Sequence, residues 1–346
     1  MRLLFNLGLL VRILPLVTAT PKPLDGWETL APIPLAPRQE HAAAALSKTT
    51  LAILGGIVPD STGEGFNTTA LFQLYDIPSG TWSRAADAPV AVNHPNLAAV
   101  NGKLYLLGGL VPAPDGAWRA FPESWVYDPD FDSWSPIAPV PAGEERGSAA
   151  VGVFGKVVYL AGGMRTLRPT GETGEQDTVA FVSAFDTETS RWVTLPRMAA
   201  FLPEGKDHAA AGVVGRKFYV LGGRKRGQRN VKDTVFVLDL ENLEAGWTTS
   251  RGRMPTPRGG VVAGTLGRKV YVFGGEGNPA EGSDGIFNET EVFDTKTETW
   301  KRLAPMAVPR HGGAAVAIGD GIYHPGGGIR QGGSPVDVFD VYRPGR

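Results

Sequence analysis

The 346-residue chain carries 34 basic and 35 acidic side chains, and its formal net charge of −1 provides no basic excess for a nucleic-acid partner. It contains no cysteine, which excludes disulfides, thiolate metal sites and a cysteine nucleophile. The 46 glycines and 28 prolines lie among aromatic and aliphatic runs. This balance predicts many short strands joined by turns rather than disorder.

The first nineteen residues are typical of a targeting segment. They have a basic start at Arg2, an apolar run over residues 3–11 and small residues at 17–19. We predict that residues 1–19 are a secretory signal peptide and that residues 20–346 form the folded domain. A transit peptide is the alternative, because this segment contains no acidic residue. The apolar run is too short to span a membrane.

A secretory route sets the expected location, which is the lumen of the secretory pathway or the outside of the cell. Two Asn-x-Thr sequons agree with this route. The predicted glycosylation sites are Asn67 and Asn288.

A short apolar strand that ends in two adjacent glycines recurs along the chain. The segment Lys269-Val-Tyr-Val-Phe-Gly-Gly275 is one copy. The first glycines of the six copies stand at positions 55, 108, 162, 222, 274 and 326, so successive copies are 53, 54, 60, 52 and 52 residues apart. Self-similarity near fifty residues indicates a repeat architecture.

Each double glycine is followed by a variable loop and then by an apolar residue and an aspartate, as in Tyr75-Asp76. In five copies a tryptophan stands six or eight residues after the aspartate. Turn signals such as Asn101-Gly102 precede the double-glycine strand and join it to an Ala/Val-rich strand. Each unit therefore predicts four short antiparallel strands, and six units predict an all-β, six-bladed β-propeller.

The order of double glycine, aromatic-Asp pair and tryptophan resembles the kelch repeat, and the resemblance covers residues 27–342. It implies a six-bladed kelch propeller, similar in its single exported domain to the sialic acid mutarotase type. The sixth unit lacks the tryptophan, whereas residues 27–32 (WETLAP) match residues 300–305 (WKRLAP). We therefore expect the N-terminal strand to complete the last blade and close the ring.

The predicted binding face carries the loops after the double glycines and the loops between blades, which vary most. The residue after each double glycine should point into the channel mouth, and these residues include Met164, Arg224 and Glu276. Asp207 and His208 begin the inner strand of the blade that contains Arg224. Since carboxylates and imidazoles beside an arginine can be tuned for proton transfer, we predict Arg224, Glu276, His208 and Asp207 as the catalytic group.

Further ligand contacts are implied by the kelch resemblance at the starts of the inner strands. The predicted contacts there are Arg38, His41, His94, Arg146, Arg258, Arg310 and His311. Trp118 offers a stacking platform for a ring, or else packs its loop onto its own blade. Met164 and His324 complete the predicted set; His324 is either a buried histidine between blades or a pocket residue.

A metal centre is the other reading of the histidines. His41, His94 and His208 each stand fourteen residues before the first glycine of their copy, so they could converge on the axis as a tris-histidine site. A histidine that recurs with the repeat explains the same spacing without a metal. We predict no metal and no cofactor.

Two functions remain open. The first is a cofactor-free isomerase, epimerase or cyclase that acts on a sugar or a natural-product intermediate at the channel mouth. The second is a non-catalytic module that binds a protein or glycan on the same face. The basic stretch Arg224–Arg229 either pairs with the acidic fifth-blade loop or holds an anionic small molecule.

Overall fold

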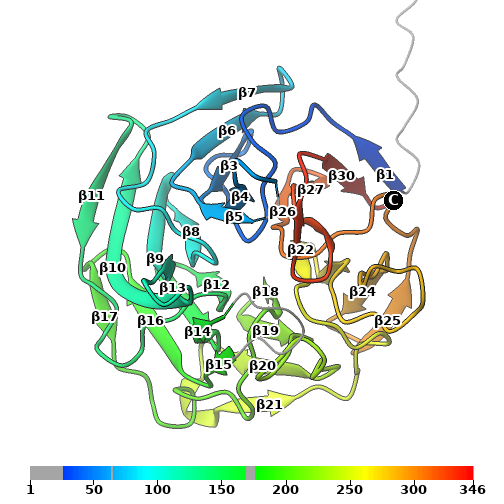
Figure 1. Cartoon of the computed structure of the whole chain (residues 1–346). Helices are drawn as coiled ribbons and strands as arrows, with labels where there is room; N and C mark the ends of the chain where they lie inside the picture. Colours follow the sequence, from blue (N-terminus) through cyan, green and yellow to red (C-terminus); the bar gives the residue numbers. More distant parts are fainter. Residues whose placement is uncertain (1–25, 64, 169–175, 346) are drawn as a thin grey trace, which may run out of the picture.

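The computed structural model describes residues 26–63, 65–168 and 176–345, so the predicted signal peptide lies outside the described residues. Six antiparallel blades surround a central axis (Figure 1). This arrangement confirms the all-β, six-bladed propeller. In the described part of the chain, no helix is long and apolar enough to cross a membrane.

The first three blades follow the chain, each running from an inner to an outer strand. Blade 1 comprises β2 (Ala42–Ala45), β3 (Thr50–Leu54), β6 (Phe72–Asp76) and β7 (Thr81–Arg84). Blade 2 comprises β8 (Leu97–Val100), β9 (Lys103–Pro112), β10 (Trp118–Asp128) and β11 (Ser133–Ile137). Blade 3 comprises β12 (Ala150–Phe154), β13 (Val157–Ala161), β16 (Val182–Asp186) and β17 (Arg191–Val193).

The last three blades complete the circle. Blade 4 comprises β18 (Ala210–Val214), β19 (Lys217–Leu221), β20 (Val235–Asp239) and β21 (Trp247–Thr249), with the short 3-10 helix η2 (Leu243–Ala245) before β21. Blade 5 comprises β22 (Val262–Leu266), β23 (Lys269–Phe273), β24 (Thr290–Asp294) and β25 (Thr299–Arg302). Blade 6 comprises β26 (Val316–Ile318), β27 (Gly321–Pro325), β30 (Phe339–Arg343) and β1 (Gly26–Thr29).

Strand β1 closes the ring as predicted. It pairs antiparallel with β30 in the register Trp27↔Tyr342, and Figure 1 shows β1 beside β30 near the C-terminus. The Trp27 ring lies 5.2 Å from the Tyr342 ring and 5.0 Å from the Phe273 ring of blade 5. The N-terminal strand therefore joins the last blade to the fifth.

The double-glycine strands are apolar on both sides because a neighbouring blade covers each side. In β23, Val270 and Val272 pack toward blade 4, whereas Tyr271 and Phe273 pack toward blade 6. The glycine after this strand has φ of 55°, and a Cβ there would lie 2.0 Å from the carbonyl oxygen of Arg310. Only glycine permits the next blade to approach so closely.

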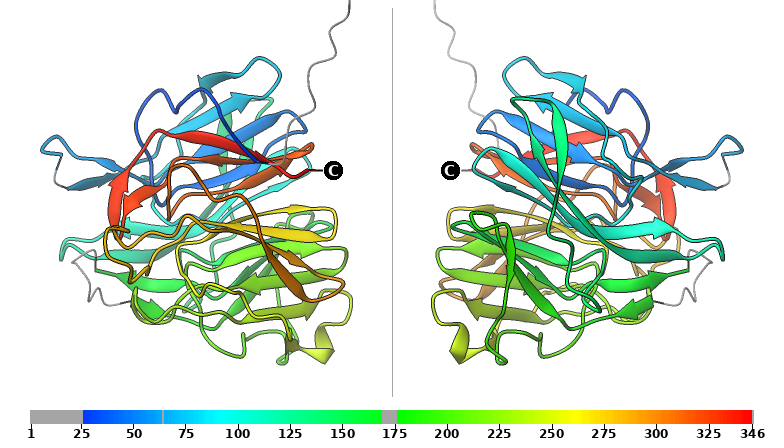
Figure 2. Two further views of the ribbon diagram at one scale, coloured as in Figure 1. Left: turned by 90° about the vertical axis from the view of Figure 1, so that its right-hand side faces the viewer. Right: turned by 90° about the vertical axis from the view of Figure 1, so that its left-hand side faces the viewer.

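Three additional hairpins rise from the loops after the double glycines. They are β4 (Ile57–Pro59) with β5 (Phe66–Thr68), β14 (Met164–Leu167) with β15 (Gln176–Thr178), and β28 (Gly328–Arg330) with β29 (Gly333–Pro335). Strand β14 also pairs with β10 of the previous blade. Figure 2 shows the β4–β5 hairpin projecting from one face of the propeller.

Candidate functional site

Six residues, one from each blade, form a backbone ring around the axis. Each precedes its inner strand and has a left-handed φ between 50° and 64°. The N–H groups of five of them donate to the carbonyl of the ring residue in the preceding blade, and His208 N–H donates to Ser148 Oγ instead. The six residues are Glu40, His94, Ser148, His208, Gly260 and Gly312, and we call them the axial ring.

Glu40, and not His41, is the axial-ring residue of blade 1. The turn before β3 is one residue longer than its counterpart in blade 2: Leu46 N–H bonds Thr50 O across three residues, whereas Val100 pairs with Lys103 across two. A count of fourteen residues back from the double glycine therefore reaches His41 in this blade, one residue past the true axial-ring residue, Glu40. The tris-histidine arrangement is thus corrected to two histidines and a glutamate.

A cavity of about 1510 Å³ opens on the face that carries the three additional hairpins. Its floor includes the axial-ring residues Glu40, His94 and His208 together with Arg224 and Glu276. Its wall is supplied by the loops after the double glycines, including Phe66, Trp118, Gln228, Asn278 and Gln331. The variable loops therefore surround the cavity, on the face expected from their variation.

Arg224 lies at the centre of a buried polar network. Its Nε donates to Asp207 Oδ1 at 3.2 Å and to Gln176 Oε1 at 3.1 Å, and its Nη1 donates to Glu276 Oε1. Its Nη2 lies 3.1 Å from His208 Nε2. The structure thus brings together all four residues of the predicted catalytic group.

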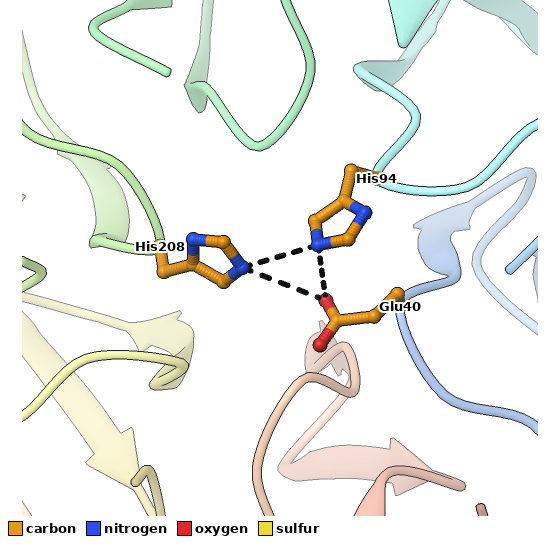
Figure 3. A group of neighbouring side chains, drawn as sticks. All are labelled: Glu40, His94 and His208. Carbon is orange, nitrogen blue, oxygen red and sulfur yellow. Dashed lines mark hydrogen bonds and ion pairs between the residues drawn. The ribbon is translucent and has the colours of Figure 1, made fainter. Parts of the chain in front are cut away.

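Two histidines and a carboxylate converge on one point beside this network (Figure 3). The Nε2 atoms of His94 and His208 are 3.1 Å apart. Glu40 Oε2 lies 3.1 Å from His94 Nε2 and 3.8 Å from His208 Nε2. Glu40 was not among the residues predicted from the sequence.

Second partners orient both rings. His208 Nδ1 lies 2.7 Å from Asp207 Oδ1, and His94 Nδ1 lies 2.7 Å from Asn93 Oδ1. The Asn93 amide is itself oriented, because its Nδ2 donates to Thr68 Oγ1 at 2.8 Å. Each Nδ1 therefore carries a proton that it donates, which leaves Nε2 of each neutral ring with a lone pair.

The charges of this cluster support one another. Burial would raise the pKa of the Glu40 carboxyl, but His94, His208 and His311 hold that pKa well below its usual range. Burial and the charge of Arg224 lower the pKa of His208, although Asp207 opposes the shift.

The two other carboxyls behave in the same way. Burial would raise the pKa of Asp207, but its hydrogen bond to His208 and the charge of Arg224 lower it. Burial would also raise the pKa of Glu276, and His311 and Arg224 lower it. The imidazoles and the guanidinium of Arg224 therefore favour the ionised form of these buried carboxyls.

An apolar cluster borders the polar floor on the side of blades 1 to 3. It contains Ile57, Leu110, Trp118, Met164 and Leu167. The Trp118 ring lines the cavity and lies 5.6 Å from the His94 ring. Met164 is fully buried beneath this surface, so it supports the cavity wall rather than lining it.

Four predicted ligand contacts lie inside their blades and not along the cavity. Arg38, Arg146, Arg258 and Arg310 are each no more than 1% exposed. Arg146 Nε donates to Gly162 O at 2.8 Å, and Arg258 Nε donates to Gly274 O at 2.6 Å. The expectation fails for these arginines because they stand two residues before the axial ring, where the side chain turns into the blade and binds its carbonyls.

The remaining predicted histidines also lie away from the cavity lining. His41 is buried one residue past the axial ring and borders the narrower hollow on the other side of it. His311 is buried behind Glu276, with Nδ1 3.5 Å from Oε2. His324 is fully buried in β27 beside Arg310 and Trp27, so the structure places it between blades rather than in the pocket.

Both predicted glycosylation asparagines are exposed. Asn67 lies in β5 of the projecting hairpin, and Asn288 precedes β24. Their positions are compatible with the predicted modification, which stays a prediction.

The repeat signature and the propeller identify the class of protein. Residues 170–327 match the family model described as the KLHDC2/KLHL20/DRC7 Kelch-repeats domain, and residues 93–141 match the Kelch motif. The chain is 39% identical over 327 residues to Kelch-like protein terF of Aspergillus terreus, covering 93% of this chain and 69% of that protein. The chain therefore belongs to the kelch-repeat family.

Other similar proteins share the architecture at lower identity. Beta-scruin of Limulus polyphemus is 25% identical over 286 residues, which cover 82% of this chain and 29% of that protein. The solved structure of YjhT superposes with a TM-score of 0.71 at 18% identity, covering 89% of this chain and 95% of that one. This structural likeness shows the fold and carries no activity.

Proposed function

We propose that the cavity binds a small molecule and that the protein acts on it as an isomerase, epimerase or cyclase. One observation carries the proposal: a buried guanidinium, two imidazoles and two carboxylates line the floor of a large cavity, and the carboxylate of Asp207 lies directly behind them. The remaining wall is partly apolar, with Trp118 and Phe66 available to a ring. Sites of this form, concave and with a few convergent polar groups, are typical of small-molecule enzymes.

The floor residues can divide such chemistry among them. Arg224 can hold a carboxylate or a carbonyl oxygen on which negative charge develops. The imidazole and carboxylate groups beside it can take a proton from one substrate atom and return it to another. A sugar or a natural-product intermediate carries the oxygens that this floor recognises, and its ring can stack on Trp118.

Hydrogen exchange provides a direct test. The purified chain is incubated in D₂O with a mixture of sugars, sugar acids and hydroxyketones, and each compound is followed by mass spectrometry and proton NMR. We expect a new isomer or the gain of one deuterium in a substrate. Arg224→Lys should reduce the rate by at least about 100-fold, because loss of one positioned donor to a developing charge has an effect of that size.

A matched control separates chemistry from folding. His41→Gln replaces a buried histidine that lies outside the cavity lining, so turnover should persist. Loss of turnover in both variants to the same extent, with unchanged thermal unfolding, would contradict the proposed floor.

A non-catalytic role is the second candidate. Large apolar side chains are exposed outside the cavity lining, among them Phe131, Met198 and Phe201. Exposed apolar surface is typical of protein-binding sites, and kelch propellers commonly bind proteins. Retained binding of a protein or glycan without turnover of any small molecule would favour this candidate.

A further inference from the structure

Three acceptor atoms face one another at the centre of the axial ring. They are His94 Nε2, His208 Nε2 and Glu40 Oε2. Because Asn93 and Asp207 accept the Nδ1 protons, both Nε2 lone pairs point toward the carboxylate and toward each other. This is the arrangement of donor atoms that a bound cation requires.

The distances suit a metal ion. Ligand atoms bonded at about 2.1 Å to one tetrahedral or octahedral ion lie roughly 3.0–3.5 Å apart. The three separations here are 3.1, 3.1 and 3.8 Å, so a point near 2 Å from all three atoms exists. Only small side-chain movements separate this arrangement from a coordination sphere.

The charges around the three ligand atoms also favour a cation. Glu40, Asp207 and Glu276 supply three carboxylates, and Arg224 supplies one guanidinium among them. Carboxylates therefore outnumber guanidinium groups in this cluster, and unpaired negative charge is costly in a buried site. A divalent cation beside Glu40 would offset this excess.

The backbone of the ligand residues adopts a conformation that non-glycine residues disfavour. Glycine fills the axial ring in blades 5 and 6, where the left-handed φ has no steric cost. Glu40, His94, Ser148 and His208 adopt the same φ as non-glycine residues, at a cost of order 1 kcal/mol each, and the first, second and fourth of them are the three residues that converge. Residues held in this region cluster at functional sites.

We propose that Glu40, His94 and His208 form a binding site for a divalent first-row transition metal ion, of the ferrous or zinc type. Two imidazoles and one carboxylate are a recognised ligand set for both ions, whereas magnesium and calcium prefer oxygen ligands alone. Asp207 accepts a hydrogen bond from His208 Nδ1, and a carboxylate in this position usually orients a metal-binding histidine.

The site is open on one side. All three ligand residues line the cavity, so the remaining coordination positions face the space where a ligand would bind. Arg224 donates to His208 Nε2 in the structure, and an ion would displace that one contact. Arg224 retains its bonds to Asp207, Gln176 and Glu276.

Metal binding can be measured without a substrate, so the inference does not depend on the proposed function. The purified full chain is stripped with a chelator, and Zn²⁺ or, without oxygen, Fe²⁺ is titrated by calorimetry. We expect one ion per chain. Co²⁺ bound to the wild type should give visible ligand-field bands. These bands report nitrogen and oxygen ligands directly, so this measurement needs no variant.

Variants then test the ligands. Glu40→Gln, His94→Gln and His208→Gln should each weaken binding by more than about 10-fold, because losing a ligand atom should matter at least as much as losing a residue that only orients a ligand. His41→Gln is the matched control and should bind as the wild type does. Absence of binding to the folded wild type, or equal binding by Glu40→Gln and wild type, would overturn the proposal.

A chelator also distinguishes the two proposals. If turnover is found and a chelator abolishes it, the ion takes part in the reaction. If the chain binds one ion and no substrate is turned over, the metal site stands and the proposed function fails. If the chain turns over a substrate but binds no ion, the proposed function stands and the metal site fails.

Discussion

Lys206 occupies the position two residues before the axial ring, which arginine fills in four other blades. Its Nζ donates to Thr234 O at 2.7 Å and lies 4.2 Å from the centre of the Phe236 ring. Burial lowers the pKa of Lys206 to about 7, although Glu204 and Asp233 oppose the shift. An arginine keeps its charge more readily in such a place.

Lys206 should therefore make stability depend on pH. Its folded-state pKa lies below the ordinary value of 10.5, so the unfolded chain binds more protons between pH 7 and pH 10, and stability rises with pH in that window. Lys206→Met removes this dependence. The difference in unfolding free energy between wild type and variant should change by about 2–3 kcal/mol from pH 7 to pH 9.5, measured by urea unfolding.

Lys217→Met is the control for this measurement, because Lys217 is an exposed lysine at the start of β19. Its difference from the wild type should stay constant over the same pH range. If the unfolding free-energy difference between wild type and Lys206→Met is also independent of pH, burial does not lower the pKa of Lys206.

Repeat register was sufficient to predict part of the site at the level of residues. Arg224 and Glu276 follow their double glycines, and His94 and His208 begin inner strands, so their direction toward the axis follows from the propeller itself. The buried arginines illustrate the limit. Whether a side chain two residues before the axial ring turns inward or into its blade depends on where the strand begins, which the repeat pattern does not reveal.

At the level of elements, one turn changes the identity of a site residue. The longer turn between β2 and β3 moves Glu40 onto the axial ring and His41 off it. Turn length is accommodated locally, since both strands keep their pairing. A fixed spacing along the sequence includes the extra turn residue and therefore selects His41, whereas the position on the axial ring depends on strand pairing and selects Glu40.

The outer-strand tryptophans connect neighbouring blades. Trp134 is half-buried, and its Nε1 donates to Ala86 O of the preceding blade at 2.9 Å. Its ring lies 5.6 Å from Phe72 of blade 1 and 5.2 Å from Tyr127 of its own blade. The side chain therefore stabilises the contact between blades by a hydrogen bond and by aromatic packing.

These two contributions can be separated by substitution. Trp134→Phe keeps most of the apolar contact and loses the hydrogen bond, so it should cost about 1 kcal/mol. Trp134→Ala loses both and should cost about 2–4 kcal/mol, below or near the range for a fully buried tryptophan. Urea unfolding of the three proteins measures both values, and equal costs for the two variants would show that the ring does not pack as described.

At the scale of the whole molecule, the sequence predicts the number and order of the blades but not the shape of the cavity. Six similar units determine the number of blades, because each unit buries its apolar sides only against neighbours. The cavity wall comes from loops that differ in every blade, such as the β4–β5 hairpin. No internal repetition constrains these loops, so the sequence alone does not determine what the cavity could bind.

Closure of the ring depends on one short strand. Strand β1 covers β30, and Trp27 joins blade 6 to blade 5 through Phe273. Without β1, β30 would present an unpaired edge, and the indole contacts would be lost. The effect should therefore extend to the whole domain.

Deleting residues 26–36 should lower the thermal unfolding midpoint by about 10 °C, since loss of several kcal/mol shifts a domain of this size by that order. The exposed edge should also increase self-association, seen by size-exclusion chromatography. A synthetic peptide with the sequence of residues 26–36, added in excess, should raise the midpoint again because it binds only the folded ring. The same peptide with Trp27→Ala is the control and should restore less. An unchanged midpoint after the deletion would show that the other five blades hold the ring closed without β1.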